Sequence, residues 1–240
     1  RAFTNIVGEQ NIFVDDISMQ KYGRDETEDL FYPPQVVVTP GTSQEISELM
    51  KLCNEHQIPV TPRGAGTGLS GGALATKGGL MISFEKMNSI LNIDEQNLQV
   101  TVEPGVITEV LQNAVKEKGL FYPPDPSSKG SCFIGGNIAE NSGGPRAVKY
   151  GVVRDFVINL EIVLPNGEIM WTGANVLKNS TGYNLTQLVV GSEGTLCIVT
   201  KIVLKLIPHP QVDLLMLVPF NNLEHAGAAV SAIFRAGFTP

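Results

Sequence analysis

Long apolar runs are missing from this sequence, and no window approaches the roughly 20 apolar residues that a membrane-spanning helix requires. The first twenty residues also lack the charged and then apolar pattern of a signal peptide. We therefore expect a cytoplasmic protein without a membrane span. The chain begins at Arg1 and stops at Pro240, directly after a predicted helix, and we expect both ends to be cut from a longer protein.

Cysteine is scarce. The three cysteines, Cys53, Cys132 and Cys197, are widely separated and show no C-x-x-C spacing. An odd and scattered set predicts neither a disulfide framework nor a zinc site. We expect no bound metal, and we expect the three cysteines to pack as small apolar side chains.

Basic runs are absent as well. The chain carries 17 Lys and Arg against 24 Asp and Glu, a formal net charge of −7, so nucleic acid is not an expected partner. Charged residues make up 17% of the chain, below the roughly 25% of an average domain. Together with 42% hydrophobic residues, this predicts extensive buried surface.

The periodicity of the apolar residues predicts both helices and strands. Thr42 and Glu45 form a capping box before apolar residues at helical spacing, which predicts a helix over 42–55. Two further helices are expected over 107–115 and 222–236, whereas residues 1–34 are polar and irregular and predict a surface-running arm. Strands are expected over 36–38, 58–60, 80–83, 90–93, 98–102, 155–164, 168–171, 195–207 and 214–218.

A glycine-rich stretch from Pro62 to Gly72 follows the second of these strands. Five of its eleven residues are glycine, so its main chain can approach a ligand closely and its amides can converge on an anion. Arg63 would supply charge, and Thr67 and Ser70 hydroxyl donors, to a phosphate or diphosphate. The alternative is a flexible surface loop.

A second candidate for ligand-binding main chain is the region 121–150, which is rich in Gly, Pro, Ser and Asn and shows no periodicity. A structureless stretch of this length inside a compact domain usually has a function.

Two known nucleotide-binding motifs do not account for the glycine loop. Gly66, Gly68 and Gly71 match the G-x-G-x-x-G spacing, with Glu85 near the position of a ribose-binding acid. A Rossmann fingerprint must open a helix, but residues 73–80 have no helical period and contain two glycines. A Walker A loop is excluded because no lysine followed by Ser or Thr has the required spacing.

Three motifs in order instead resemble the FAD-binding fold of the vanillyl-alcohol oxidase type, also called PCMH-type. Residues 62–72 resemble its first diphosphate loop, and 191–195 resemble its Gly-Ser-Glu-Gly-Thr signature. The second FAD loop is matched by Ser131, Gly135, Gly136, Asn137, Ala139, Asn141, Gly143 and Gly144. The resemblance covers residues 30 to 210 and is closest to the FAD-linked subunit of glycolate oxidase and to D-lactate and D-2-hydroxyglutarate dehydrogenases.

The resemblance implies an α+β fold: a PCMH-type FAD-binding domain of two α+β subdomains, followed by the start of a truncated ferredoxin-like cap domain. It places an N-terminal arm at 1–30, the FAD-binding domain at 31–208 and the beginning of the cap domain at 209–240.

The resemblance also implies the cofactor and its site. FAD would be noncovalent, because Thr67 stands where covalent relatives use a histidine. The first loop would hold the diphosphate. Asp125, Pro126 and the second loop would lie near the flavin, and Tyr150 and Gly151 would close the pocket. The adenosine side would be lined by Glu193, Gly194 and Ile198. Strand core is the alternative for Ile198, and turn chemistry is the alternative for Asn137 and Asn141. The residues expected to bind FAD are Arg63, Gly64, Ala65, Gly66, Thr67, Gly68, Ser70, Gly71, Gly72, Asp125, Pro126, Ser131, Gly135, Gly136, Asn137, Ala139, Asn141, Gly143, Gly144, Tyr150, Gly151, Glu193, Gly194 and Ile198.

The implied activity is oxidation of a small D-2-hydroxy acid, such as glycolate or D-lactate, with electrons passed to an unidentified acceptor or partner subunit. No catalytic residue is assigned: His56, His209 and His225 lie in no motif and are expected at the surface, and the resemblance places substrate-binding arginine and histidine in the cap domain. Two alternatives stay open. One is a flavin-binding electron-transfer or assembly subunit without a substrate site, and the other is a non-redox transferase similar to alkyl-dihydroxyacetone-phosphate synthase.

Overall fold

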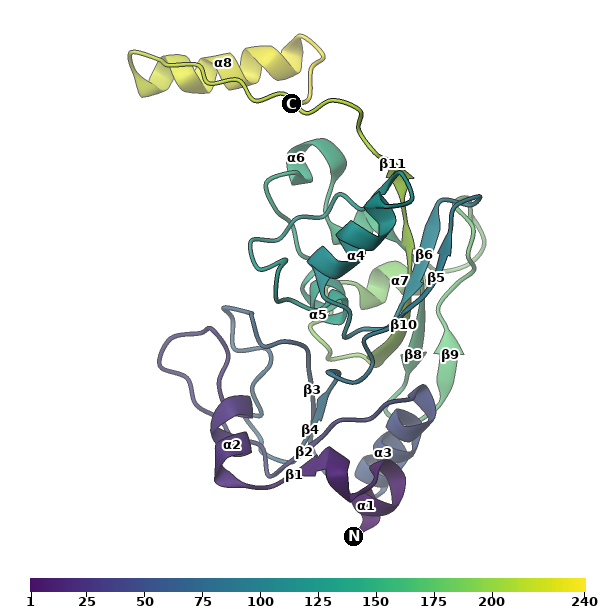
Figure 1. Cartoon of the computed structure of the whole chain (residues 1–240). Helices are drawn as coiled ribbons and strands as arrows, with labels where there is room; N and C mark the ends of the chain where they lie inside the picture. Colours follow the sequence, from purple (N-terminus) through teal and green to yellow (C-terminus); the bar gives the residue numbers. More distant parts are fainter.

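A computed structural model describes all residues of the chain, 1–240. It contains two α+β units and a C-terminal segment that stands away from them (Figure 1). The expected α+β fold of two subdomains is therefore confirmed. None of the helices combines the length and the apolar character that a membrane crossing needs.

The first unit is a four-stranded sheet in the order β1-β2-β4-β3. Strands β2, β4 and β3 are parallel, and β1 pairs antiparallel with β2 at the edge. The helices of this unit are α1 (Ala2–Val7), α2 (Asp16–Tyr22) and α3 (Ser43–Glu55), with a 3-10 turn at Glu9–Asn11. Its strands are β1 (Ile12–Phe13), β2 (Val36–Val38), β3 (Val60–Arg63) and β4 (Leu80–Ser83).

Helix α3 covers this sheet as its sequence predicts. Thr42 is the N-cap, and its hydroxyl accepts a hydrogen bond from the Glu45 amide at 3.2 Å. Ile46, Leu49 and Cys53 lie on one face of the helix and are buried in the core of the unit.

The second unit is a five-stranded antiparallel sheet in the order β5-β6-β10-β8-β9. One core of buried apolar side chains, among them Leu111, Ile134, Leu160 and Ile202, holds its helices against the sheet. Its strands are β5 (Ile90–Asp94), β6 (Gln99–Val102), β8 (Val157–Val163), β9 (Ile169–Trp171) and β10 (Ile198–Lys205), and a separate pair is formed by β7 (Leu120–Phe121) and β11 (Ile207–Pro208). Its helices are α4 (Thr108–Lys116), α5 (Ile134–Glu140), α6 (Ala147–Tyr150) and α7 (Leu185–Val189), with a 3-10 turn at Val153–Phe156.

The two units are joined at α3 and β8. The Ser43 hydroxyl donates to the Glu161 carboxylate at 2.6 Å, and Val163 and Ile198 of the second sheet are buried in the core of the first unit. The carboxylate of Glu161 also accepts from Thr200 at 3.0 Å and from Lys201 at 2.9 Å. This network fixes the orientation of the units that face each other across the site described below.

The prediction of an irregular N-terminal arm is wrong. Residues 1–30 contain α1, α2 and the edge strand β1, and Val7 and Tyr22 are buried against the first sheet. Asp15 caps α2 by accepting from the Ser18 amide at 3.0 Å. These elements are two to seven residues long, too short for periodicity to detect.

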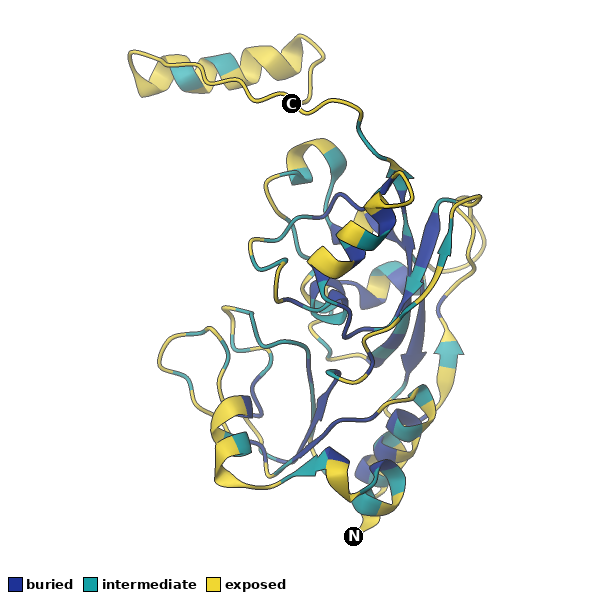
Figure 2. Cartoon of the chain, viewed as in Figure 1, coloured by how far each residue is buried: buried dark blue, intermediate teal, exposed yellow.

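The C-terminal segment is only partly as predicted. Helix α8 (Leu223–Arg235) forms, with Asn222 as its N-cap accepting from the His225 amide at 2.8 Å. The strand expected over 214–218 does not form, because the chain offers it no neighbouring strand to pair with. The large apolar side chains of this segment are exposed, and Figure 2 shows most of the segment as exposed.

Candidate functional site

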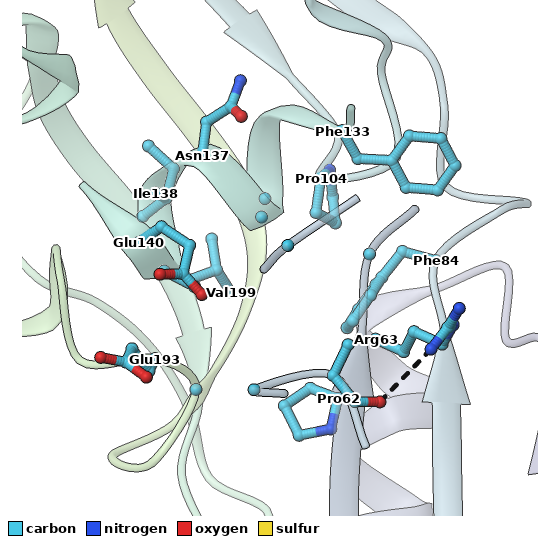
Figure 3. A pocket seen from close by; sticks show the side chains of 18 of the residues that line it. Pro62, Arg63, Phe84, Pro104, Phe133, Asn137, Ile138, Glu140, Glu193 and Val199 are labelled. Carbon is cyan, nitrogen blue, oxygen red and sulfur yellow. Dashed lines mark hydrogen bonds between the residues drawn. The ribbon is translucent and has the colours of Figure 1, made fainter. Parts of the chain in front are cut away.

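A cavity opens between the two units. Its empty space, open mouth included, is about 1100 Å³. The first unit contributes the glycine loop and Phe84, while the second contributes α5 and the turn before β10 (Figure 3). More than half of the residues predicted to bind a cofactor line it: Arg63, Gly64, Ala65, Gly66, Thr67, Gly68, Gly72, Gly135, Gly136, Asn137, Ala139, Glu193, Gly194 and Ile198.

The glycine loop presents its main chain to this cavity. Gly66 has a φ of 75°, in the region that favours glycine. A Cβ added at Gly68 or Gly136 would meet no atom within 4 Å, so both main chains border open space. The two loops also touch, since a Cβ at Gly64 would lie 3.7 Å from the Gly136 Cα.

Arg63 differs from its predicted role as a phosphate-binding cation. Its side chain is 6% exposed and lies beneath the loop, where the guanidinium fills the space that a Cβ of Gly66 would need. It donates long hydrogen bonds of 3.4 Å to the carbonyl oxygens of Tyr22 and Ala73. Burial lowers the pKa of Arg63, while the nearby charge of Asp25 opposes that shift. Arg63 therefore supports the loop from behind.

The second loop contains a helix that the sequence did not predict. Helix α5 spans Ile134–Glu140, and the amide of Gly135 donates to the Pro104 carbonyl at 2.8 Å. A Cβ at Gly135 would stand 2.7 Å from the Pro104 side chain, so glycine allows the close approach. The two glycines at 135 and 136 obscured the helical period, because glycine disfavours helix interiors.

The two asparagines of this loop use their side chains within the protein. Asn137 donates to the Thr108 hydroxyl at 2.6 Å. Asn141 ends α5 with a φ of 52° and accepts from the Arg154 amide at 2.9 Å. Their side chains therefore act in turn and core structure, the alternative left open above, although Asn137 still borders the cavity.

The Gly-Ser-Glu-Gly-Thr turn completes the wall. The amides of Gly191 and Glu193 donate to the carbonyls of Ile138 and Ala139, at 2.9 and 3.0 Å, which attaches this turn to α5. Ile198 is part of the first unit's core, as its alternative interpretation expected, and it also lines the cavity; its contact with FAD stays a prediction.

Two carboxylates approach each other on this wall. Glu140 and Glu193 lie on the same side of the cavity, opposite Phe84 and Arg63 (Figure 3). A Cβ at Gly72 would lie 3.5 Å from Glu140 Oε1 and 3.8 Å from Glu193 Oε2. Burial raises the pKa of Glu140, and the charge of Glu193 raises it further.

The other predicted residues do not line the cavity. Asp125 binds Lys129 at 2.9 Å and Arg146 at 3.6 Å, and a side chain at Gly144 would overlap the Asp125 carbonyl. Tyr150 packs edge-on against Phe121. The predicted residues that do not line the cavity are Ser70, Gly71, Asp125, Pro126, Ser131, Asn141, Gly143, Gly144, Tyr150 and Gly151.

Sequence reasoning missed the other half of the lining. Nine of these residues directly adjoin predicted ones, so extending each motif by one position would have found them: Pro62, Ala73, Cys132, Ile138, Glu140, Ser142, Ser192, Cys197 and Val199. The other five stand apart from the predicted residues: Phe84, Pro104, Ser128, Phe133 and Val189.

The histidines lie outside the site, whereas two of the three cysteines, Cys132 and Cys197, line the cavity. No histidine lines the cavity; His56 and His225 are exposed as expected, whereas His209 is half-buried against Phe121. All three cysteines are free and buried, as expected. No group of three or more His, Cys, Asp or Glu side chains is arranged to hold a metal ion.

The residues present fit FAD. Glycine main chain on both loops gives close approach and amide donors for a diphosphate. Phe84, Phe133 and Val199 give the apolar surface that an aromatic ring system needs.

Comparison with known proteins agrees with this geometry. The profile of the family described as FAD binding domain matches residues 34–173. The chain is 51% identical to glycolate oxidase subunit GlcD of Bacillus subtilis (strain 168), over 91% of this chain and 47% of that protein. It is 47% identical to a D-lactate dehydrogenase of Anaerostipes hadrus, over 86% of this chain and 43% of that protein.

A solved structure of alkyldihydroxyacetonephosphate synthase superimposes with a TM-score of 0.81 at 22% identity, covering 95% of this chain and 43% of that one. This likeness concerns the fold. The chain spans about half the length of the curated relatives it matches. The family expected from the three motifs is thus confirmed: the chain belongs to the PCMH-type FAD-binding domain family, and FAD is its cofactor.

Proposed function

We propose that the chain is the FAD-binding part of an oxidoreductase that converts a small D-2-hydroxy acid, such as glycolate or D-lactate, into the 2-oxo acid. The observation that carries the proposal is the identity of 47–51% to relatives named for these activities, over 86–91% of the chain. When bound, FAD supplies the hydride acceptor that such an oxidation needs.

The chain's own residues have a binding role in this proposal. We assign the diphosphate to the main chain of the glycine loop and of α5, and the flavin ring to the apolar lining around Phe84 and Phe133. The predicted residues that line the cavity keep their assignment except Arg63, which supports the glycine loop from behind. We assign the ten predicted residues that do not line the cavity to support of the loops rather than to contact with the cofactor. Noncovalent binding of FAD is favoured because Thr67 lines the cavity and no histidine does.

The substrate requires groups that these residues do not supply. A carboxylate substrate needs a cation and a base for its hydroxyl proton. The cavity's one cation, Arg63, is turned under the glycine loop. The carboxylates of Glu140 and Glu193, which line the cavity, would repel an acidic substrate. We propose that these groups belong to a cap domain that begins at residues 209–240, whose apolar side chains are exposed.

The lack of a free cation in the cavity also favours a second candidate, a flavin-binding electron-transfer or assembly subunit without its own substrate site. In either case electrons leave to an acceptor or partner subunit. A cytoplasmic location is also part of the proposal, supported by three buried, unpaired cysteines.

The test uses the FAD-loaded protein with the whole of its natural chain. It is mixed anaerobically with glycolate, D-lactate, L-lactate and D-2-hydroxyglutarate, and the absorbance of the oxidised flavin is followed. Bleaching by D-acids but not by L-lactate is expected. Flavin that is bleached by dithionite but by none of the acids would reject the dehydrogenase in favour of the second candidate.

A further inference from the structure

The segment before the family match contacts the glycine loop. The profile of the FAD-binding domain begins at residue 34, yet α2 and the segment 23–32 lie against residues 62–72. We call residues 16–32 the N-terminal clamp.

Two contacts join the clamp to the loop. The amide of Gly71 donates to the Thr27 hydroxyl at 2.9 Å. Arg63 Nη1 donates to the Tyr22 carbonyl, and its guanidinium lies 5.8 Å from the centre of the Tyr22 ring. The Gly71 amide is therefore committed to Thr27, which is why Gly71 faces away from the cavity although its motif predicts a ligand contact.

The clamp is itself firmly held. Tyr22 is 4% exposed, packs with Val37 and Met81, and donates through its hydroxyl to Glu85 at 3.1 Å. The segment 23–32 is closed by the Tyr32 amide, which donates to the Gly23 carbonyl at 2.9 Å. Asp25 accepts from the Thr27 amide at 2.9 Å, which orients Thr27 toward the loop.

The clamp also places charge behind the loop. Arg63 forms no salt bridge, and Asp25 Oδ2, whose charge acts on it, is buried without a hydrogen-bond partner. Gly66 rests on the guanidinium. The conformation of the loop thus depends on the position of Arg63, which depends in turn on α2.

We propose that Tyr22 and Thr27 are positioning residues for the cofactor: the N-terminal clamp holds the glycine loop with its amides directed into the cavity before FAD binds. Preorganisation of this kind increases affinity because the cost of ordering the loop is met during folding. The inference rests on FAD occupying this cavity, and not on the identity of the substrate.

The test is the FAD affinity of the Thr27→Val variant of this chain, measured by quenching of flavin fluorescence. Valine keeps the shape of threonine but leaves the Gly71 amide unpaired, so a loss of about 3- to 10-fold in affinity is expected. Thr27→Ser keeps the hydroxyl and should restore binding, and Thr4→Val, a matched change in α1 away from the loop, should have no effect.

The unfolding midpoint of each apoprotein variant shows whether a loss of FAD affinity comes only from a less stable fold. We expect the ranking of the variants by unfolding midpoint to differ from their ranking by FAD affinity. Wild-type affinity in Thr27→Val would overturn the clamp while leaving the cofactor site intact. A wild-type chain that fails to bind FAD would overturn both.

Hydrogen exchange of the wild-type chain gives a second measurement that needs no variant. Residues 23–32 and 64–72 should gain protection together when FAD is added. Protection of 64–72 alone would overturn the clamp.

Discussion

Gly66 rests directly on the guanidinium group of Arg63, so a side chain at position 66 would displace a buried arginine. Two residues later, Gly68 borders the open cavity, and a Cβ added there would meet no atom within 4 Å. We therefore propose that the two glycines serve different purposes: Gly66 allows the loop to pack on Arg63, and Gly68 leaves room for the ligand.

This contrast predicts that replacement by alanine lowers the stability of the fold at position 66 and the affinity for FAD at position 68. Gly66→Ala should destabilise the apoprotein by about 1–3 kcal/mol, because the residue has a positive φ and presses on Arg63. Gly68→Ala should change stability by less than about 0.5 kcal/mol and lower FAD affinity on the order of tenfold. Urea unfolding and flavin fluorescence measure the two effects; equal effects at both positions would contradict the assignment.

Glu161 links the two units, and its loss should weaken the whole fold. Burial alone would raise its pKa, but hydrogen bonds from Ser43, Lys201 and Thr200 more than offset this and hold the pKa below its ordinary value. Its stabilising contribution is therefore complete above pH 4.5 and is lost as the pH falls through the lowered pKa.

We expect Glu161→Gln to lower the free energy of unfolding by about 1–3 kcal/mol at pH 7, with a smaller difference at pH 3. Glu95→Gln is the control, because Glu95 pairs with Lys118 in solvent and should matter little. A difference between wild type and Glu161→Gln that is independent of pH would show that charge is not involved.

Glu140 should respond to pH in the opposite direction. Its raised pKa means that the folded protein holds the proton more tightly than the unfolded chain, so stability falls as the pH rises from 4.5 through that pKa. Glu140→Gln should accordingly be more stable than wild type at pH 8 and equal to it at pH 4. Thermal unfolding of the apoprotein checks this, with exposed Glu48→Gln as the control; parallel pH profiles would be evidence against repulsion between Glu140 and Glu193.

Tyr122 is fully buried, and its hydroxyl has no hydrogen-bond partner. Its ring packs edge-on against Phe156, a contact that phenylalanine would keep. Because an unsatisfied buried hydroxyl costs free energy, Tyr122→Phe should be neutral or stabilising by about 1 kcal/mol. Chemical denaturation measures this, and a clear loss of stability would reveal a partner for the hydroxyl.

The sequence predicted those features that depend on local pattern. Helix α3 follows from the Thr42 cap and the spacing of Ile46, Leu49 and Cys53. The glycine loops were found because their composition is unusual and their order matches a family. A detached strand at 214–218 was predicted wrongly because β-propensity cannot show whether a partner strand exists.

The missed features depend on contacts between distant segments. Glu140 and Glu193 come close only because the turn 191–195 folds against α5, and the sequence around Glu140 gives no sign of this contact. Arg63 looked like a phosphate ligand because its neighbours are glycines, but the buried Tyr22, 41 residues earlier, draws its side chain beneath the loop.

Retention of FAD shows whether the glycine-lined cavity holds the cofactor. The chain is refolded or expressed with excess FAD, passed through gel filtration, and its absorption spectrum is recorded beside that of the Gly68→Val variant. We predict that wild-type protein elutes with about one flavin per chain, while Gly68→Val elutes without flavin and keeps helical circular dichroism. Wild-type protein that elutes free of flavin, or a variant that retains it fully, would contradict the account.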